Sequence, residues 1–168
     1  CDCSDNFGTR YLINDACLIL NKPLIYGSVQ GFEGQVSVFN LKKNSPNFRD
    51  LLPTPPEQGQ IPSCTDYGVI GISPGIIGIL QANEIIKIII KKGKVLDGKI
   101  LIFNLLENSM KKLNLTVSKH AKIINDLRTN AKDYNSEINC GSINRISNVE
   151  FKKIYQTNLN EIIIFDIR

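Results

Sequence analysis

Apolar and polar positions alternate along the chain in short segments typical of both helices and strands. The spacing of apolar residues predicts a helix over Thr9–Leu20, which Pro23 would end. An apolar run at Pro23–Val29 and an alternating pattern at Gln35–Phe39 predict two strands. We interpret Asp2–Asp5 as the end of an earlier strand that runs into a turn.

A proline-rich segment separates these elements from the most apolar part of the chain. Asn40–Ser63 contains five prolines and predicts a long loop, a feature that is often functional. After it, Ser73–Pro74 is typical of an N-cap followed by proline in the first helical turn. We expect the helix to end near Ile90, before Lys91–Gly93. Because its first half is apolar on every side, we expect it to be buried on all faces, and polar residues interrupt it too often for a membrane span.

The second half of the chain predicts further strands and a domain boundary. Lys99–Phe103 and Lys111–Val117 are expected to be strands, whereas residues 118–141 are polar, without a clear period, and are interpreted as a linker. Residues 142–168 carry strand, helix and strand patterns. The order of elements predicts an α/β fold, with the second half of one domain in residues 1–117 and the opening of another after the linker.

Composition narrows the class of protein. Hydrophobic residues make up 42% of the chain and charged residues 21%, as in an ordinary globular protein. The net charge of +4 comes from 15 Lys and only 5 Arg, whereas recognition of phosphates and bases favours arginine, so nucleic-acid binding is not indicated. The five cysteines form no C-x-x-C and predict neither a disulfide framework nor a standard zinc site. Since the sequence begins at Cys1, we interpret it as part of a longer protein.

Two residues at the start of the first helix could carry chemistry. Asp5 and Asn6 lie where the first strand meets that helix, and ligands of open α/β sheets bind beyond the carboxyl ends of the strands. A carboxylate there can hold Mg²⁺ on the phosphates of a nucleotide. The alternative, which position alone favours, is that Asp5 or Asn6 caps the helix.

A third candidate, Cys64, lies between the proline-rich segment and the apolar helix. A thiol near a helix N-terminus has a lowered pKa and is more reactive, although a buried apolar cysteine is the commoner case. Gly71, Gly75 and Gly78 lack the lysine and spacing of a P-loop, so close helix packing is the preferred interpretation. The single histidine, His120, leaves no Ser-His-Asp triad or H-E-x-x-H site within this sequence.

An ordered series of motifs resembles the sulfur-carrier-activating adenylyltransferases, relatives of the ubiquitin-activating enzymes. It begins with D-x-x-D-N-x-x-x-R-x-x-x-N-x-x-C at Asp2–Cys17 and continues with F-E-G-Q-x-x-V-F at Phe32–Phe39 and P-S-C at Pro62–Cys64. It extends through P-G-I-I-G-x-x-Q-A-x-E-x-x-K at Pro74–Lys87. Several motifs in order are more specific than any one of them.

A shorter resemblance, to the opening of a rhodanese-like sulfurtransferase domain, lies in residues 146–168. Together the two resemblances imply the C-terminal part of a Rossmann-like adenylyltransferase domain in residues 1–117 and a truncated rhodanese-like domain in residues 142–168. The glycine-rich nucleotide loop would lie upstream of Cys1, so the fragment alone is expected to be inactive and to bind ATP poorly.

The resemblance implies that ATP and Mg²⁺ are used to adenylate the C-terminal glycine of a small ubiquitin-like sulfur carrier. Asp5 matches the family's Mg²⁺–ATP aspartate, and Asn6 matches its nucleotide-binding neighbour. Cys64 matches a cysteine proposed to form a transient covalent link during sulfur transfer. The implied partners are the carrier, a sulfur donor (a cysteine desulfurase or a rhodanese persulfide) and a second copy in a homodimer, with neither nucleic acid nor a membrane.

Many members of this family hold a structural zinc with two C-x-x-C pairs. The first pair would fall at Asn47 and Asp50, and no C-x-x-C follows Lys111–Lys112, so we expect no structural zinc. Zinc-less forms and an AT-rich codon bias suggest a plastid-encoded protein, with the bacterial cytoplasm as the alternative.

The pathway expected from the resemblance is molybdopterin biosynthesis, with carrier activation for thiamine or tRNA thiolation as alternatives. A non-catalytic partner subunit of the same fold and a nicotinamide-dependent Rossmann enzyme are further alternatives. The nicotinamide enzyme would leave the proline-rich segment and Cys64 unexplained.

Overall fold

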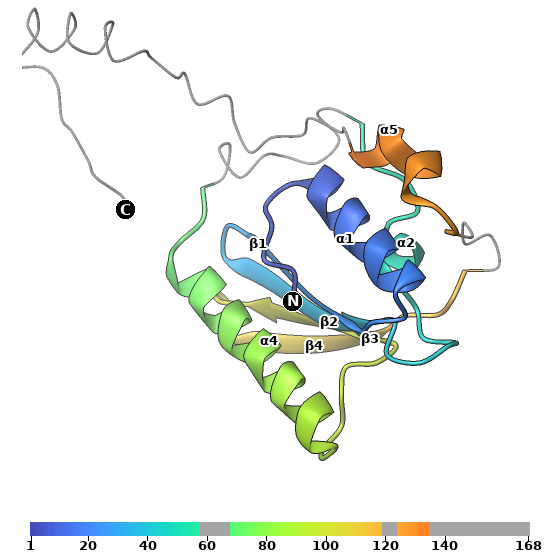
Figure 1. Ribbon diagram of the computed structural model, residues 1–168. Helices are drawn as coiled ribbons and strands as arrows, with labels where there is room; N and C mark the ends of the chain where they lie inside the picture. Colours follow the sequence, from blue (N-terminus) through green and yellow to red (C-terminus); the bar gives the residue numbers. More distant parts are fainter. Residues whose placement is uncertain (58–67, 119–123, 135–168) are drawn as a thin grey trace, which may run out of the picture.

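The computed structural model describes residues 1–57, 68–118 and 124–134 as a mixed α/β fold (Figure 1). In chain order its elements are α1 (Phe7–Ile19), β1 (Leu24–Gln30), β2 (Glu33–Phe39), α2 (Phe48–Leu51), α4 (Ile72–Ile90), β3 (Lys99–Asn104), β4 (Ser109–Asn114), η1 (Leu127–Asn130) and α5 (Ala131–Tyr134). The helix and four strands predicted from residues 9–39 and 99–117 are thereby confirmed, with shifts of a few residues at their ends.

The four strands form one antiparallel sheet in the order β1-β2-β3-β4. Tight turns join β1 to β2 and β3 to β4, because Gln30 pairs with Glu33 and Asn104 pairs with Ser109. Gly31 and Asn108 in these turns have positive φ, the conformation that glycine and asparagine adopt most readily. Asp2 adds a parallel bridge to Tyr26 on the outer side of β1, so the N-terminal segment runs alongside the sheet.

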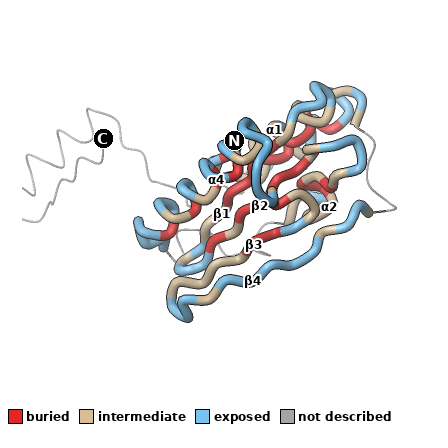
Figure 2. Tube along the Cα trace, turned by 90° about the horizontal axis from the view of Figure 1, so that it is seen from below, coloured by how far each residue is buried: buried red, intermediate tan, exposed pale blue. Residues whose placement is uncertain are grey.

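Helices cover both faces of this sheet, and the buried residues follow the strands between them (Figure 2). On the face of α1 and α2 the core consists of Tyr11, Leu24, Tyr26, Phe39, Phe48 and Ile100. On the face of α4 it consists of Ile25, Val36, Val38, Ile77, Leu96 and Leu101. Neighbouring residues of one strand fall in different clusters because successive side chains point to opposite faces.

The prediction that α4 is buried on all faces is wrong. α4 turns Ser73, Ile77, Gln81 and Glu84 toward the sheet, and it exposes a series of isoleucines, namely Ile72, Ile79, Ile86, Ile89 and Ile90. Polar side chains can lie on the buried face because each finds a hydrogen-bond partner there. Among the described residues, α4 alone has the length and apolar composition of a membrane-spanning helix, but its inner face packs on β1 and β2.

The first turn of α4 also differs from the prediction. The N-cap is Gly71, not Ser73, which lies inside the helix and donates its hydroxyl to the Gly31 carbonyl at 3.0 Å. The expectation of close packing at Gly71, Gly75 and Gly78 is also wrong for the described part of the chain, because a Cβ at any of them would meet nothing within 4 Å.

The close approach is provided instead by two glycines of the sheet. A Cβ at Gly34 would lie 2.4 Å from Ile77 Cδ1, and one at Gly27 would lie 2.5 Å from the amide of Gln81. Glycine at these two positions therefore lets α4 lie directly on β1 and β2.

Two segments contain structure that was not predicted. The long loop holds the short helix α2, and the predicted linker holds η1 and α5, which pack against α1 (Figure 1). Cys64 and the predicted rhodanese-like domain lie outside the described residues.

Candidate functional site

The segment that leads to Asp5 is held by hydrogen bonds to three neighbouring elements. The Asp2 amide donates to the Ile25 carbonyl at 2.8 Å, and the Asp2 carbonyl accepts the buried Gln81 amide, also at 2.8 Å. Two residues further on, the Ser4 carbonyl accepts from the Arg10 guanidinium at 2.7 Å. The backbone before Asp5 is therefore fixed by three side-chain or main-chain contacts to β1, α4 and α1.

Asn6 is the N-cap of α1, as the capping alternative predicts. Its side-chain oxygen accepts the Thr9 amide at 2.8 Å, and its side-chain nitrogen lies 3.5 Å from Asp5 Oδ1. Asp5 itself is exposed and immediately precedes the helix. A helix N-terminus attracts anions, so phosphate groups and a metal-bound carboxylate are both compatible with this position.

Sequence reasoning did not identify the two side chains that support this segment, Arg10 and Gln81. Arg10 is mostly buried and lies over the Tyr26 ring at 5.2 Å from its centroid, an attractive cation–π arrangement. The Asp2 carboxylate turns back to Ser4, accepting from its amide at 2.9 Å and its hydroxyl at 2.7 Å. The only signal of Arg10 and Gln81 in the sequence was their place in the motifs that begin with D-x-x-D-N and contain Q-A-x-E.

A second polar cluster lies at the other end of α1, around Arg49. Its guanidinium binds Asp15 at two points and Asp133 at 2.8 Å, and it stacks over the Tyr11 ring. Burial disfavours the charge of Arg49, but the hydrogen bonds and charges of Asp15 and Asp133 outweigh it and raise the Arg49 pKa. Every charge here is paired, which indicates a structural role rather than a catalytic one.

Cys17, the cysteine of the first motif, has no reactive setting. It packs beside the aromatic core on the α1 face, and burial raises the pKa of its thiol. A raised pKa lowers the fraction of thiolate, the nucleophilic form, so this setting does not favour a reactive Cys17.

The positions of the family's first zinc pair are committed to hydrogen bonds. Asn47 caps α2, and Asp50 Oδ2 accepts from the Asn47 amide at 2.8 Å and from its side chain at 2.7 Å. The other oxygen of Asp50 accepts the Ser118 amide at 2.7 Å. Within the described ranges, no three His, Cys, Asp or Glu side chains lie close enough to hold one metal ion. These residues do not suit a zinc site.

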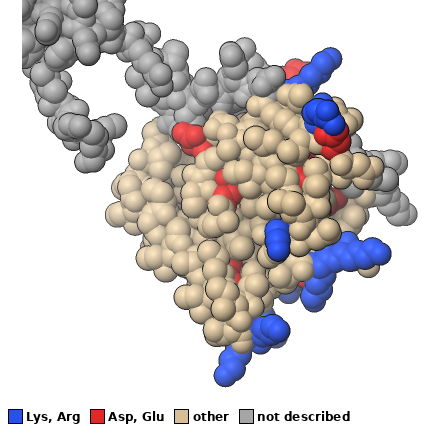
Figure 3. All heavy atoms as spheres, viewed as in Figure 1, with Lys and Arg blue, Asp and Glu red and all other residues tan. Residues whose placement is uncertain are grey.

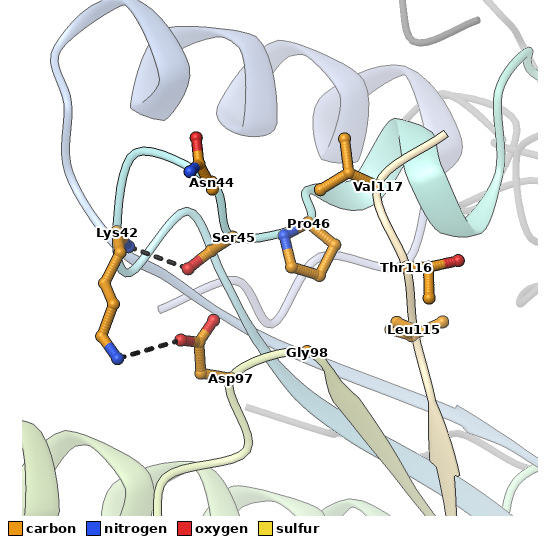
Figure 4. A pocket seen from close by; sticks show the side chains of 9 residues that line it. All are labelled: Lys42, Asn44, Ser45, Pro46, Asp97, Gly98, Leu115, Thr116 and Val117. Carbon is orange, nitrogen blue, oxygen red and sulfur yellow. Dashed lines mark hydrogen bonds and ion pairs between the residues drawn. The ribbon is translucent and has the colours of Figure 1, made fainter. Parts of the chain in front are cut away.

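The cleft shown in Figure 4 has a volume of about 370 Å³. Its lining residues come from the loop after β2, from Asp97–Gly98 and from the segment after β4. Lys42 and Asp97 face one another across it at 3.8 Å. Among the described residues that line this cleft, neither Asp5 nor Asn6 occurs.

Charged side chains are sparse on the face that carries α4 and the N-terminal segment (Figure 3). Basic side chains gather at the end of α4, where Lys91, Lys92 and Lys94 are exposed, as expected for a solvated helix end. Lys87 is different, because it pairs with the buried Glu84 and donates to the Lys94 carbonyl at 2.9 Å.

The family model described as the ThiF family matches residues 1–123. The chain belongs to the ThiF family. The motifs from Asp2 to Lys87 therefore lie within a matched ThiF region, and the resemblance found in the sequence is confirmed.

Curated relatives of this ThiF-family chain are longer than it is. It is 40% identical over 144 residues to a sulfur carrier protein adenylyltransferase of Thermus thermophilus, covering 83% of this chain and 53% of that protein. It is 37% identical over 168 residues to a probable molybdopterin-synthase adenylyltransferase of Pyropia yezoensis, covering 99% and 43%. With an adenylyltransferase and sulfurtransferase MOCS3 of Drosophila grimshawi it shares 48% over 103 residues, covering 61% and 23%. The chain thus spans about half the length of the Thermus and Pyropia proteins and less than a quarter of the Drosophila protein.

Solved structures support the fold. The crystal structure of E. coli MccB with ATP superposes on this ThiF-family chain with a TM-score of 0.57 at 15% identity, covering 73% of this chain and 38% of MccB. At that identity the likeness concerns the fold, which MccB and this chain share.

Proposed function

We propose that the protein adenylates the C-terminal glycine of a small ubiquitin-like sulfur carrier with ATP and then takes part in sulfur transfer to it, in molybdopterin biosynthesis. The names of the three relatives support adenylyl transfer, a sulfur carrier and the molybdopterin pathway. The observation that carries the proposal is Asp5, an exposed carboxylate on a fixed backbone at the N-terminus of α1, inside the matched ThiF region.

Asp5 would hold Mg²⁺, a hard cation that prefers carboxylate oxygens and phosphate oxygens. When bound, the metal offsets the negative charge that develops as the carrier's carboxylate attacks the α-phosphate and pyrophosphate leaves. Asn6 contributes through its side-chain nitrogen, since its oxygen is engaged in capping α1. The N-terminus of α1, which directly follows Asp5 and Asn6, favours bound phosphate.

Cys64 is proposed as the thiol that forms a transient covalent link during sulfur transfer, with a cysteine desulfurase or a rhodanese persulfide as sulfur donor. Its support is its place in the P-S-C motif and the sulfurtransferase named in one relative. The rhodanese-like domain proposed for residues 142–168 rests on the residue motif, and the match to the Pyropia protein, which covers 99% of this chain, includes this segment.

A homodimer, a plastid location and the absence of structural zinc, nucleic acid and membrane partners complete the proposal. The exposed isoleucines of α4 support the homodimer, because monomeric proteins rarely expose so many large apolar side chains in one stripe. The hydrogen bonds of Asn47 and Asp50 support the proposal of no structural zinc. Metal analysis of the full-length protein is expected to find none, and one tightly held zinc per chain would overturn this.

Carrier-dependent exchange between ATP and pyrophosphate tests the proposal in the full-length protein. Asp5→Asn should abolish exchange, while Glu107→Gln, at an exposed carboxylate in the β3–β4 turn, should leave it unchanged. Cys64→Ala should spare exchange and impair sulfur transfer to the carrier. Near-normal exchange in Asp5→Asn would remove Asp5 from the mechanism, and unimpaired transfer in Cys64→Ala would remove Cys64.

A further inference from the structure

Gln81 is a buried amide that α4 directs across the edge of the sheet. Only 3% of the residue is exposed. Its nitrogen donates to the Asp2 carbonyl at 2.8 Å, and its oxygen lies 3.6 Å from the Cys3 thiol, which donates to it. A buried amide without partners is costly, so these two contacts fix where Gln81 and the N-terminal segment lie relative to one another.

Gly27 makes this contact possible. It lies in β1 directly under the Gln81 side chain, where a Cβ would come within 2.5 Å of Gln81 Cδ and Nε2. Asp2 bridges to Tyr26, the residue before Gly27. The Gln81 side chain therefore passes over β1 at Gly27 and reaches the N-terminal segment at Asp2.

The contact acts on the short stretch that ends at Asp5. Asp2 is held by Gln81 and by the Ile25 carbonyl, and Ser4 is held by Arg10 and by the Asp2 carboxylate. The next residue is Asp5, whose side chain is exposed. With the backbone on its N-terminal side fixed and Asn6 capping α1 on the other, the Asp5 carboxylate is confined to a narrow region at the helix N-terminus.

We propose that Gln81 is a positioning residue for the metal–nucleotide site: through the Asp2 carbonyl it holds the Asp2–Asn6 segment so that Asp5 is pre-organised for Mg²⁺ on the phosphates of ATP. This role rests on the proposed function of Asp5. Gln81 thereby couples α4 to Asp5, through the backbone of Asp2 to Ser4.

Two measurements in the full-length protein test the coupling. Gln81→Met keeps the length of the side chain and removes the amide, and Gln81→Glu keeps its shape and removes the donor. Asn83→Ala, at an exposed amide of the same helix, is the matched control. Amide hydrogen exchange of the Asp2–Asn6 segment is expected to rise about tenfold in both Gln81 variants, since a lost buried hydrogen bond corresponds to about that factor.

The second measurement is ATP affinity with and without Mg²⁺. We expect the dissociation constant of Mg²⁺–ATP to rise about tenfold in the Gln81 variants while that of metal-free ATP stays unchanged, because only the former depends on the Asp5 carboxylate. A general loss of structure would weaken both equally and would overturn the positioning role. Gly27→Ala, which displaces Gln81 from the other side, should reproduce the effect even if a Gln81 variant does not fold.

Unchanged hydrogen exchange in the Asp2–Asn6 segment would overturn the coupling whatever the activity. If Asp5→Asn leaves Mg²⁺–ATP affinity intact while Gln81→Met still accelerates exchange in the segment, the proposed function of Asp5 is wrong and the coupling of Gln81 to the segment stands.

Discussion

Arg49 and Asp15 form a two-point ion pair that is almost completely buried. Arg49 Nε lies 2.9 Å from Asp15 Oδ1 and Nη2 lies 2.7 Å from Oδ2, with side-chain exposures of 1% and 0%. The pair joins α1 to α2 across the aromatic core, and Asp133 and Tyr134 extend it to α5. One guanidinium therefore holds together three segments that are far apart in the sequence.

Removing the charge of Arg49 should strongly destabilise the fold. Arg49→Met leaves Asp15 as a buried charge without its partner, which costs about 3–5 kcal/mol. Lys42→Met, which breaks the pair between the exposed Lys42 and Asp97, should cost at most about 1 kcal/mol. Urea denaturation followed by circular dichroism measures both. Equal small losses in the two variants would show that the buried pair contributes no more than an exposed one.

Tyr134 should make stability depend on alkaline pH. Burial, followed by its hydrogen bond to Asp15 at 2.7 Å, raises the pKa of Tyr134 to about 12 from an ordinary value of 10.0. The folded state thus holds the phenolic proton more tightly than the unfolded state. Its contribution to stability is complete below pH 10 and declines as the pH rises toward 12.

Comparing Tyr134→Phe with the unsubstituted protein isolates this contribution. Burial also raises the pKa of Tyr11, but Tyr11 is present in both proteins. The difference in urea midpoint between the two proteins should be constant up to about pH 10 and shrink above it. A difference that does not change between neutral pH and pH 12 would contradict the raised pKa.

The sheet was predictable from the sequence because its strands follow a local rule. Val36 and Val38 alternate with polar neighbours, and the turn at Asn108 separates the apolar run Ile100–Phe103 from the alternating segment Leu113–Val117. Strand positions could therefore be inferred without knowledge of their partners. α2 was missed although Asn47 and Asp50 have the spacing of a capping box, since the prolines around them favoured a loop. α5 was missed because its position depends on Arg49, more than 80 residues earlier.

The orientation of α4 and the contacts that hold the Asp2–Asn6 segment could not be inferred either, because they too depend on partners elsewhere in the sequence. Gln81 and Glu84 lie on the buried face because Asp2 and Leu96 offer hydrogen-bond partners, and these contacts span 79 and 12 residues. Counting apolar residues alone therefore predicts burial on all faces of α4, whereas only one face is buried. The capping role of Asn6 was predictable, since it depends on Thr9 three residues away.

Asp50 should stabilise the fold by joining two segments through hydrogen bonds. It completes the capping box of α2 and accepts the Ser118 amide from the segment after β4. Asp50→Ala is expected to cost about 2 kcal/mol, the sum of a lost cap and a partly buried amide without its acceptor. Asp126→Ala removes the exposed cap of η1, which accepts the amide of Arg128 only two residues away, and should destabilise the fold clearly less. Equal losses in thermal melting or urea denaturation would exclude a cross-linking role for Asp50.

A charge on the outer face of α4 should disrupt self-association. Ile72, Ile79 and Ile86 recur every seven residues and are all exposed, Ile79 at 71%. A seven-residue repeat of exposed isoleucines is the pattern by which helices pair, and burying each side chain stabilises an interface by about 1.5–3 kcal/mol. Ile79→Asp should therefore raise the dimer dissociation constant by about tenfold or more, whereas Leu106→Asp, at an exposed leucine in the β3–β4 turn, should not. Sedimentation equilibrium of the full-length protein distinguishes the cases, and an Ile79→Asp protein that dimerises like the unsubstituted one would exclude α4 as the interface.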